Sequence, residues 1–517
     1  MMARLLQQLC IAGSILLTAC SSQTSTSNES QNKATAKAAK PNFVFIFADD
    51  QSPKTIGAYG NPHIKTPTLD EIANNGVNFT NAHNMGSWTG AVCLASRTML
   101  NSGLSVWQAK QQDQNYKNGQ GLQQTWSKLM EKQGYDTYMT GKWHVHAPAH
   151  KIFNTAKTVR GGMPKDYWQH HKMVAAFKAL ANGTSQAKSA EELMPVGYNR
   201  PLNKNDDSWS PTDPKFGGFY QGGKHWSEVV KDEALGFINS AAQKDKPFFM
   251  YLAFNAPHDP RQAPQAYQDM YQAEQLPLPS NWQANYPEKD QIGNGPSLRD
   301  AALAPFPRTE YATQVHLKEY YALITHLDEQ IGAIIKALKA SGKFDNTYIV
   351  YTADHGLAVG EHGLFGKQNM YEHSIRSPYI IWGPGLEKGK VVDANIYLQD
   401  TMATALELAG ATKPEHVYFN SILDLAKGKT NTSHYNGIYG AYRESQRMIK
   451  KGGYKLIVYP TANTIKLFDL QNDKDEKHNL FAKPQYRQKA KQLFNDLLDL
   501  QKEMQDELDI SAMQSLL

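Results

Sequence analysis

Cysteine is scarce in this chain, with only three among 517 residues. Cys10 and Cys20 lie in the N-terminal stretch where an export signal and its processing site are expected. Cys93 is therefore left without a disulfide partner in the mature chain. A lone thiol of this kind is either inert packing or a reactive centre, which makes Cys93 the first candidate for chemistry.

Other absences narrow the class of protein. The chain has 54 basic and 49 acidic residues, a net charge of +5, with no basic block or interleaved aromatic and basic stripe. We therefore expect no nucleic acid partner. After the N-terminus no stretch is apolar enough to cross a membrane, and no internal repeat is visible. The small positive excess suits an anionic substrate without requiring one.

The N-terminus has the layout of a signal peptide over residues 1–19. Arg4 precedes a mostly apolar stretch that is too short to span a bilayer. The ending Leu-Thr-Ala-Cys at residues 17–20 resembles the lipobox of bacterial lipoproteins, which implies a lipid on Cys20; ordinary signal cleavage is the alternative. Residues 20–40 hold nothing large and apolar and are expected to form a flexible tether. We expect an exported protein, lipid-anchored to the bacterial cell envelope at the outer membrane or in the periplasm.

Apolar runs of strand length predict the fold class. They cover residues 42–48, 135–140, 248–254 and 348–352. A run without alternation is typical of a strand buried on both faces, and helix-like segments precede the later runs, most clearly at 316–340. The pattern predicts an α/β fold with a large, mostly parallel sheet sandwiched by helices.

A second, smaller domain is expected at the C-terminus. From about residue 435 the pattern changes to short strands, followed by a helix over residues 484–504. We predict a catalytic domain over residues 41–434 and a small antiparallel α+β subdomain over residues 435–517. Irregular stretches at 150–230 and 263–308 either line a substrate cleft or are ordinary surface insertions.

Reactive side chains follow each predicted strand of the large sheet. In parallel sheets, ligands bind beyond the carboxyl ends of the strands. Three carboxylates gathered there would repel each other without a cation, so their convergence would imply a divalent metal. Taken singly, each group has an ordinary explanation as a turn, a helix cap or a surface residue. The residues at these strand ends are Asp49, Asp50, Lys142, His144, His258, Asp354 and His355.

The ordered motifs resemble the type I formylglycine-dependent sulfatases of the alkaline-phosphatase-like superfamily, nearest to iduronate-sulfatase-like and bacterial polysaccharide sulfatases. The family signature is a Cys, followed two residues later by Pro or Ala, then after two more residues by Arg, with a Gly downstream. It is matched here by Cys93, Ala95, Arg97 and Gly103. The resemblance runs in order from about residue 41 to the end of the chain. The accompanying motifs are Ala48-Asp49-Asp50, Tyr59-Gly60-Asn61, Gly141-Lys142-Trp143-His144, Ala256-Pro257-His258, Asp354-His355-Gly356, and Gly360-Glu361-His362-Gly363 before Lys367.

The resemblance implies a cofactor and a modified residue. In the family a maturation enzyme oxidises the signature cysteine, here Cys93, to formylglycine, an aldehyde that is hydrated in the active enzyme. One hydroxyl of the hydrate, bound to calcium, attacks sulfur, and the second hydroxyl lets the sulfated intermediate collapse with release of sulfate. The resemblance implies one calcium ion per chain, held by Asp49, Asp50, Asp354, His355 and residue 93.

The resemblance also assigns roles to the surrounding residues. Arg97 would steady the hydrate, and Lys142 and Lys367 would neutralise the sulfate oxygens. His144 would accept the proton of the second hydroxyl, and His258 would donate to the leaving oxygen. Two departures from the family pattern stand out: His355 occupies a position where many members have Asn, and Val145-His146 follow His144 where Gly is common.

Together with the signal-like N-terminus, the resemblance implies an exported sulfatase that hydrolyses sulfate esters on a polysaccharide or oligosaccharide. Two alternatives remain open. The first is a phosphate or phosphonate ester hydrolase of the same superfamily, and the second is a glycan-binding lipoprotein without turnover. The expected partners are a sulfated carbohydrate, the formylglycine-generating maturation enzyme, and a membrane reached through the lipid on Cys20.

Overall fold

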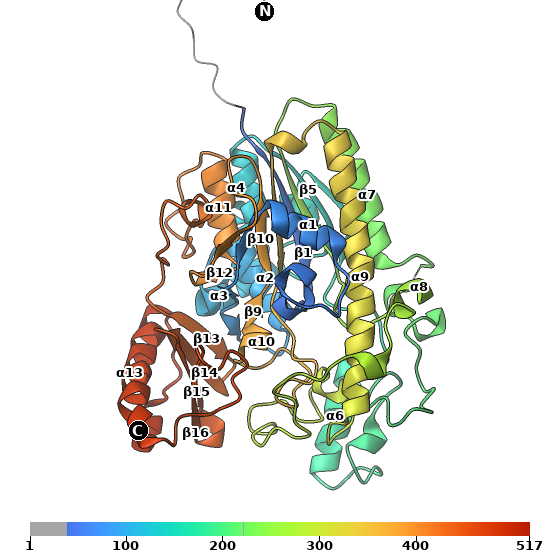
Figure 1. The fold of residues 1–517 in the computed structure, drawn as a ribbon, viewed down its shortest axis with the longest axis vertical. Coiled ribbons are helices and arrows are strands. Elements are labelled where there is room, and N and C mark those ends of the chain that lie inside the picture. The colour runs from blue at the N-terminus through green and yellow to red at the C-terminus, as the bar shows by residue number, and fades with distance from the viewer. Residues whose placement is uncertain (1–38, 221) are drawn as a thin grey trace, which may run out of the picture. The chain divides into compact units, whose positions relative to one another are not determined.

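A computed structural model describes residues 39–220 and 222–517 (Figure 1). The predicted signal peptide, Cys20 and nearly all of the predicted tether lie outside the described residues. Residues 40–517 form one compact unit. No helix within the described ranges is both long and apolar enough to span a bilayer.

The central feature is an eight-stranded, mostly parallel sheet. Strand β1 pairs in parallel with β7 on one side and with β8 on the other, and β10 is the antiparallel member. The fold class predicted from the sequence is therefore confirmed. In sheet order the strands are β11 (Lys390–Val392), β2 (Val77–Phe79), β10 (Tyr379–Trp382), β8 (Thr347–Ala353), β1 (Asn42–Ala48), β7 (Phe248–Ala253), β5 (Asp136–Lys142) and β6 (Thr155–Arg160).

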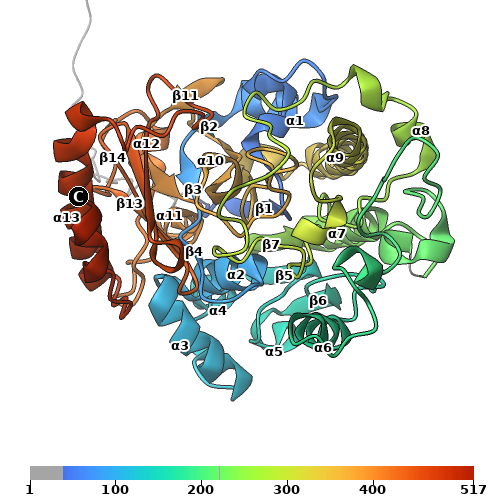
Figure 2. The same cartoon turned by 90° about the horizontal axis from the view of Figure 1, so that it is seen from below.

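Helices cover both faces of this sheet, as Figure 2 shows in a view along the strands. Helix α9 extends over Glu310–Ala340, so the expected helix at 316–340 begins six residues earlier, where the hydroxyl of Thr309 caps it. The helices are α1 (Pro67–Asn75), α2 (Val92–Ser102), α3 (Val106–Lys117), α4 (Trp126–Lys132), α5 (Ala149–Ile152), α6 (His170–Ala181), α7 (Trp226–Ala242), α8 (Gln265–Gln268), α9, α10 (Glu372–Ile375), α11 (Asp400–Leu408), α12 (Leu423–Ala426) and α13 (Arg487–Glu503).

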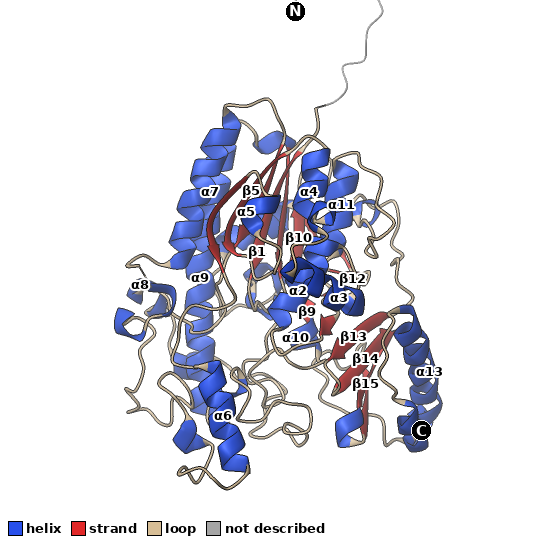
Figure 3. Ribbon diagram, turned by 180° about the vertical axis from the view of Figure 1, so that it is seen from behind, coloured by secondary structure: helices blue, strands red, loops and turns tan. Residues whose placement is uncertain are grey.

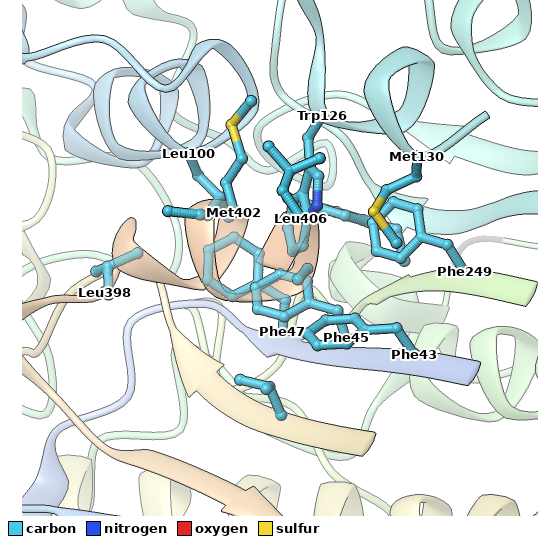
Figure 4. Packing of buried hydrophobic residues seen from close by; sticks show 14 of the residues in the cluster. Phe43, Phe45, Phe47, Leu100, Trp126, Met130, Phe249, Leu398, Met402 and Leu406 are labelled. Carbon is cyan, nitrogen blue, oxygen red and sulfur yellow. The ribbon is translucent and has the colours of Figure 1, made fainter. Parts of the chain in front are cut away.

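The packing of strand β1 explains why its sequence does not alternate between apolar and polar residues. Its odd-numbered phenylalanines, such as Phe45, pack against Trp126 of α4 and residues of α11 (Figure 4). Its even-numbered residues, such as Ile46, pack in a separate core with α1, α7 and α9. Both faces of the strand are thus covered, and an apolar side chain is needed at every position.

The C-terminal residues form a second sheet with α13 beside it (Figure 3). Four strands of this sheet are antiparallel, in agreement with the antiparallel subdomain predicted from the sequence. They are β13 (Ile438–Tyr442), β14 (Gln446–Lys451), β15 (Tyr454–Tyr459) and β16 (Thr464–Asp469). The short strand β4 (Gly86–Ser87) pairs in parallel with β13, so this sheet takes one strand from the segment before Cys93. The predicted boundary between the two domains, at residues 434 and 435, stays a prediction.

A third small sheet consists of β3 (Ala82–His83), β9 (Arg376–Ser377) and β12 (Ile396–Tyr397).

Candidate active site

The ends of neighbouring strands bring the candidate acids together. Ala48 and Ala353 are paired residues at the ends of β1 and β8, so Asp49 and Asp50 emerge beside Asp354 and His355. The backbone N–H of Asp50 donates to Oδ1 of Asp354 at 3.2 Å. All four side chains are buried.

Cys93 reaches the same place from the first turn of α2. Its Sγ lies 3.3 Å from Nε2 of His355 and 3.8 Å from Oδ1 of Asp50. Potential ligand atoms of Asp49, Asp50, Cys93, Asp354 and His355 all lie within 4.8 Å of one another. The structure therefore brings together all the residues that the sequence suggested for a metal.

The charges of this cluster fit a hard divalent cation. Burial and the neighbouring Asp354 raise the pKa of Asp49 well above its ordinary value, and Oδ1 of Asp49 has no hydrogen-bond partner. Against the effect of burial, His355 and Arg97 lower the pKa of Asp354 to about 2. Buried carboxylate oxygens are the ligands that Ca²⁺ prefers, whereas the nitrogen of His355 is an unusual donor for it.

Arg97 connects the ends of strands β5 and β8 next to the cluster. Its Nε donates to Oδ2 of Asp354 at 2.9 Å, and its Nη1 donates to the carbonyl of Lys142 at 2.7 Å. The guanidinium also stacks on the ring of Phe47, with its Cζ 4.5 Å from the ring centroid. Burial opposes the charge, but Asp354 and Asp49 raise the pKa of Arg97, so it remains a cation.

Two lysines approach the carboxylates from separate segments. The Nζ of Lys142, at the end of β5, is paired with Asp49. The Nζ of Lys367 contacts both oxygens of Asp50, at 2.9 and 2.7 Å. Burial raises the pKa of the Cys93 thiol, but Lys142, Lys367 and His355 outweigh burial and hold that pKa well below its usual value. The surroundings of residue 93 thus favour a negatively charged group.

His258 lies at the Lys367 side of the cluster. Its Nε2 is 2.8 Å from Nζ of Lys367 and 3.5 Å from Oδ2 of Asp50. Burial lowers the pKa of His258, but Asp50 and Asp259 raise it to about 10. The two carboxylates therefore favour a protonated ring, and the contact with Lys367 is then a close approach of two cations across Asp50 rather than a hydrogen bond.

His144 lies two residues beyond Lys142 in the sequence. It is half-buried, has a left-handed backbone conformation with φ of 50°, and lies against Cys93. Burial lowers the pKa of His144, which favours a neutral ring able to accept a proton. The structure thus gathers all of the catalytic candidates, Cys93, Arg97, Lys142, His144, His258 and Lys367, around the same cluster.

Sequence reasoning missed several residues around His258. Asp259 contacts Nδ1 of His258, Asp300 lies 3.4 Å from Nζ of Lys367, and Arg299 joins Asp259 to Asp300. Of these residues, only Asp259 could have been identified from the sequence, because it directly follows His258. Asp300 and Arg299 lie in an irregular stretch without periodicity, so their sequence did not point to the site.

Two family models match the chain. The model described as "Sulfatase" matches residues 41–411, and the model described as "N-sulphoglucosamine sulphohydrolase, C-terminal" matches residues 360–503. An arylsulfatase from Clostridium perfringens is 30% identical over 470 residues, which cover 87% of this chain and 92% of that protein. An N-acetylglucosamine-6-O-sulfatase from Bacteroides thetaiotaomicron is 26% identical over 90% of this chain and 87% of its own length.

Solved structures share the fold. One, in complex with its substrate D-glucosamine-2-N,6-O-disulfate, has a TM-score of 0.66 at 22% identity and covers 90% of this chain and 99% of its own. A phosphonate monoester hydrolase from Silicibacter pomeroyi has a TM-score of 0.67 at 21% identity, with 91% and 96% covered. The family model spans more than half of the chain, and its match agrees with the named relatives and with the motifs. The chain therefore belongs to the sulfatase family of the alkaline-phosphatase-like superfamily and is a sulfuric ester hydrolase.

Proposed function

We propose that this enzyme removes sulfate from a sulfated polysaccharide or oligosaccharide, with a formylglycine made from Cys93 and one calcium ion. The observation that carries this proposal is the buried cluster of Asp49, Asp50, Asp354 and His355 around Cys93. Calcium, when bound to these side chains, would supply the positive charge that polarises the sulfate ester and activates the nucleophile. A maturation enzyme is the implied partner for the oxidation of Cys93.

The chain's own side chains would divide the remaining work. Arg97 fixes the ends of β5 and β8, and holds positive charge beneath residue 93. Lys142 and Lys367 lie where they can neutralise sulfate oxygens, because each already neutralises a carboxylate of the cluster. A sulfate ester has no proton to titrate near neutral pH, so fixed cations must supply this stabilisation.

The two histidines would divide the proton transfers between them. His144, kept neutral by burial, would take a proton at residue 93 when sulfate is released. His258, whose Nε2 faces Lys367 and Asp50, would donate a proton to the leaving sugar oxygen. An acid and a base with shifted pKa values in opposite directions are typical of such a division of labour.

The carbohydrate substrate is supported by the names of the relatives. They include the N-acetylglucosamine-6-O-sulfatase and an ulvan-active sulfatase from Formosa agariphila, which is 27% identical over 86% of this chain and 78% of its own length. We also propose export and a lipid on Cys20, based on the lipobox-like sequence at residues 17–20. The enzyme would then meet polysaccharide at the cell envelope.

The decisive experiment measures sulfate release from a panel of sulfated glycans. The chain is co-produced with a formylglycine-generating enzyme, and peptide mass over residues 91–97 reports the conversion of Cys93. Sulfate release that disappears in Cys93→Ala supports the proposal, and activity that survives in this variant refutes it. Phosphonate monoester hydrolases share the fold, so aryl phosphate and phosphonate esters are tested in parallel. Release of phosphate or phosphonate without sulfate would favour the alternative hydrolase, and binding without turnover would favour the glycan-binding protein.

A further inference from the structure

We propose that Asp259 is a positioning residue for His258, and that Arg299 fixes Asp259 to the insertion between β6 and α7. This inference rests on the proposed function, because it assigns His258 to the leaving oxygen. It goes beyond that function because Asp259 and Arg299 lie outside the cluster of Asp49, Asp50, Cys93, Asp354 and His355, although Asp259 forms a second buried group with His258 and Asp50.

The two nitrogens of His258 face different surroundings. Nε2 points to the reaction centre, 2.8 Å from Nζ of Lys367 and 3.5 Å from Oδ2 of Asp50. Nδ1 points away from it and lies 3.0 Å from Oδ1 and 2.9 Å from the backbone carbonyl of Asp259. An N–H at Nδ1 therefore has acceptors on one residue only, and this interaction aims Nε2 at the leaving oxygen.

The second oxygen of Asp259 is held by Arg299. Nη2 of Arg299 pairs with Oδ2 of Asp259, while Nη1 donates to Oδ1 of Asp300 at 3.0 Å. Both carboxylate oxygens of Asp259 are thus engaged, and its side chain is 3% exposed. A carboxylate fixed at both oxygens cannot rotate, so the ring that it binds keeps its orientation as well.

Arg299 is itself anchored on the insertion. Its Nη2 and Nε donate to Oδ2 of Asp166 at 2.8 and 3.2 Å, and the hydroxyl of Tyr198 donates to the same oxygen at 2.5 Å. Tyr198 packs on Trp168 in a small apolar cluster that also contains Leu303. The irregular insertion therefore supports the acid side of the active site through a continuous set of charge-assisted contacts.

The proton balance of the step shows what Asp259 contributes. The S–O bond to the sugar breaks as the sulfuryl group passes to the nucleophile, and the sugar oxygen takes the proton from Nε2. His258 is left neutral, with its remaining hydrogen on Nδ1 and donated to Asp259. The attacking hydroxyl releases its own proton to solvent, and a proton from solvent then restores the N–H at Nε2. A ring without Asp259 can turn or carry its hydrogen on the wrong nitrogen, and the leaving oxygen then loses its donor.

The test compares leaving groups of different acidity. The 4-nitrophenolate ion is a weak base and leaves its sulfate ester without assistance from an acid. The phenolate ion is a stronger base, so phenyl sulfate needs the proton. For Asp259→Asn we expect kcat/KM on 4-nitrophenyl sulfate within about 3-fold of the wild type, and a loss on phenyl sulfate on the order of 10- to 1000-fold, within the range of general acid catalysis. The matched control is Asp269→Asn, an exposed aspartate of the neighbouring helix α8 region, which should leave both rates unchanged.

Equal losses on both esters, or no loss on either, would overturn the proposal, because a merely structural role does not depend on the leaving group. Arg299→Gln is measured with the same esters in case Asp259→Asn does not fold, and the same selective loss is expected. A crystal structure of either variant gives a readout that is independent of turnover: the ring of His258 should turn away from Lys367, and an unchanged ring would contradict the inference. If the matured wild type releases sulfate from no ester at all, the proposed function itself fails.

Discussion

Gly162 lies directly against the imidazole of His144. A Cβ placed on Gly162 would be 2.6 Å from Cε1 and 2.8 Å from Nε2 of that ring. The glycine comes from the loop after β6, whereas His144 follows β5, so adjacent parallel strands bring the two together. Only a residue without a side chain leaves the ring in its present position.

Gly162→Ala should therefore displace the ring of His144. We expect kcat to fall by about 10- to 100-fold, a part of the contribution that a positioned acid or base makes. Gly161→Ala is the matched control, because a Cβ at that position meets nothing within 4 Å. The measurement is the kcat of both variants on the same sulfate ester. Equal kcat values would show that catalysis does not depend on the ring position of His144 that Gly162 allows.

Arg97→Lys should cost both activity and stability. Lysine has a single nitrogen and cannot hold Asp354 and the carbonyl of Lys142 together, so one buried partner is left unpaired. We expect a loss of about 3 kcal/mol in the free energy of unfolding and a fall in kcat of more than about 100-fold. Urea unfolding and sulfate release are the two measurements.

Arg447→Lys separates the two effects. Arg447 is equally buried but pairs with Asp506 in the C-terminal sheet region. The substitution should lower stability with little change in kcat. A comparable fall in kcat for this variant would mean that Arg97 acts only through stability.

Calcium should raise the thermal stability of the protein. A cation that binds only the folded state stabilises it by about 2.7 kcal/mol at 100 times its Kd. We expect the Tm to fall on addition of EGTA and to recover with excess Ca²⁺, and Asp354→Asn to abolish the response. Differential scanning calorimetry of protein with unmodified Cys93 is sufficient, so the result does not depend on turnover. A Tm that is insensitive to chelator and to Ca²⁺ would remove calcium from the proposal.

His225 should make the protein less stable in mild acid. Its Nδ1 accepts from the backbone N–H of Ser227 at 3.1 Å and caps α7, and its Nε2 lies 2.9 Å from the carbonyl of Gln262. Burial lowers the pKa of His225 from 6.5 to about 4. The unfolded chain then binds the proton more readily, so the contribution of His225 is complete above about pH 6.5 and is lost as the pH falls toward 4.

The loss from this residue is on the order of 3 kcal/mol. His225→Asn keeps a capping side chain that does not titrate, so the free energy of unfolding should decline less steeply between pH 6.5 and 4 than in the wild type. Urea titrations across this range test the slope, with the exposed His63→Asn as control. The same slope in His225→Asn and the wild type would assign the acid sensitivity to other groups.

Much of the site was predictable from local sequence. An apolar run that ends in a charged residue marks the end of a buried strand, and the ends of parallel strands share one edge of the sheet. That reasoning alone placed Asp50, Lys142, His258 and Asp354 near one another, and the structure brings them together. The lack of a disulfide partner had already singled out Cys93, and the resemblance assigned it to this site and added Arg97 and Lys367. These three residues lie on a helix or in a loop rather than directly at the end of a strand.

The contacts between irregular segments were not predictable. The recruitment of β4 into the C-terminal sheet, the position of Gly162 on His144, and the chain of contacts from Asp166 through Arg299 to Asp259 have no periodic signal. The sequence by itself determined which side chains stand at the carboxyl edge of the sheet, because strand period and burial are local properties. Only the tertiary structure decided how these side chains are oriented, because orientation depends on the packing of loops that are distant along the chain.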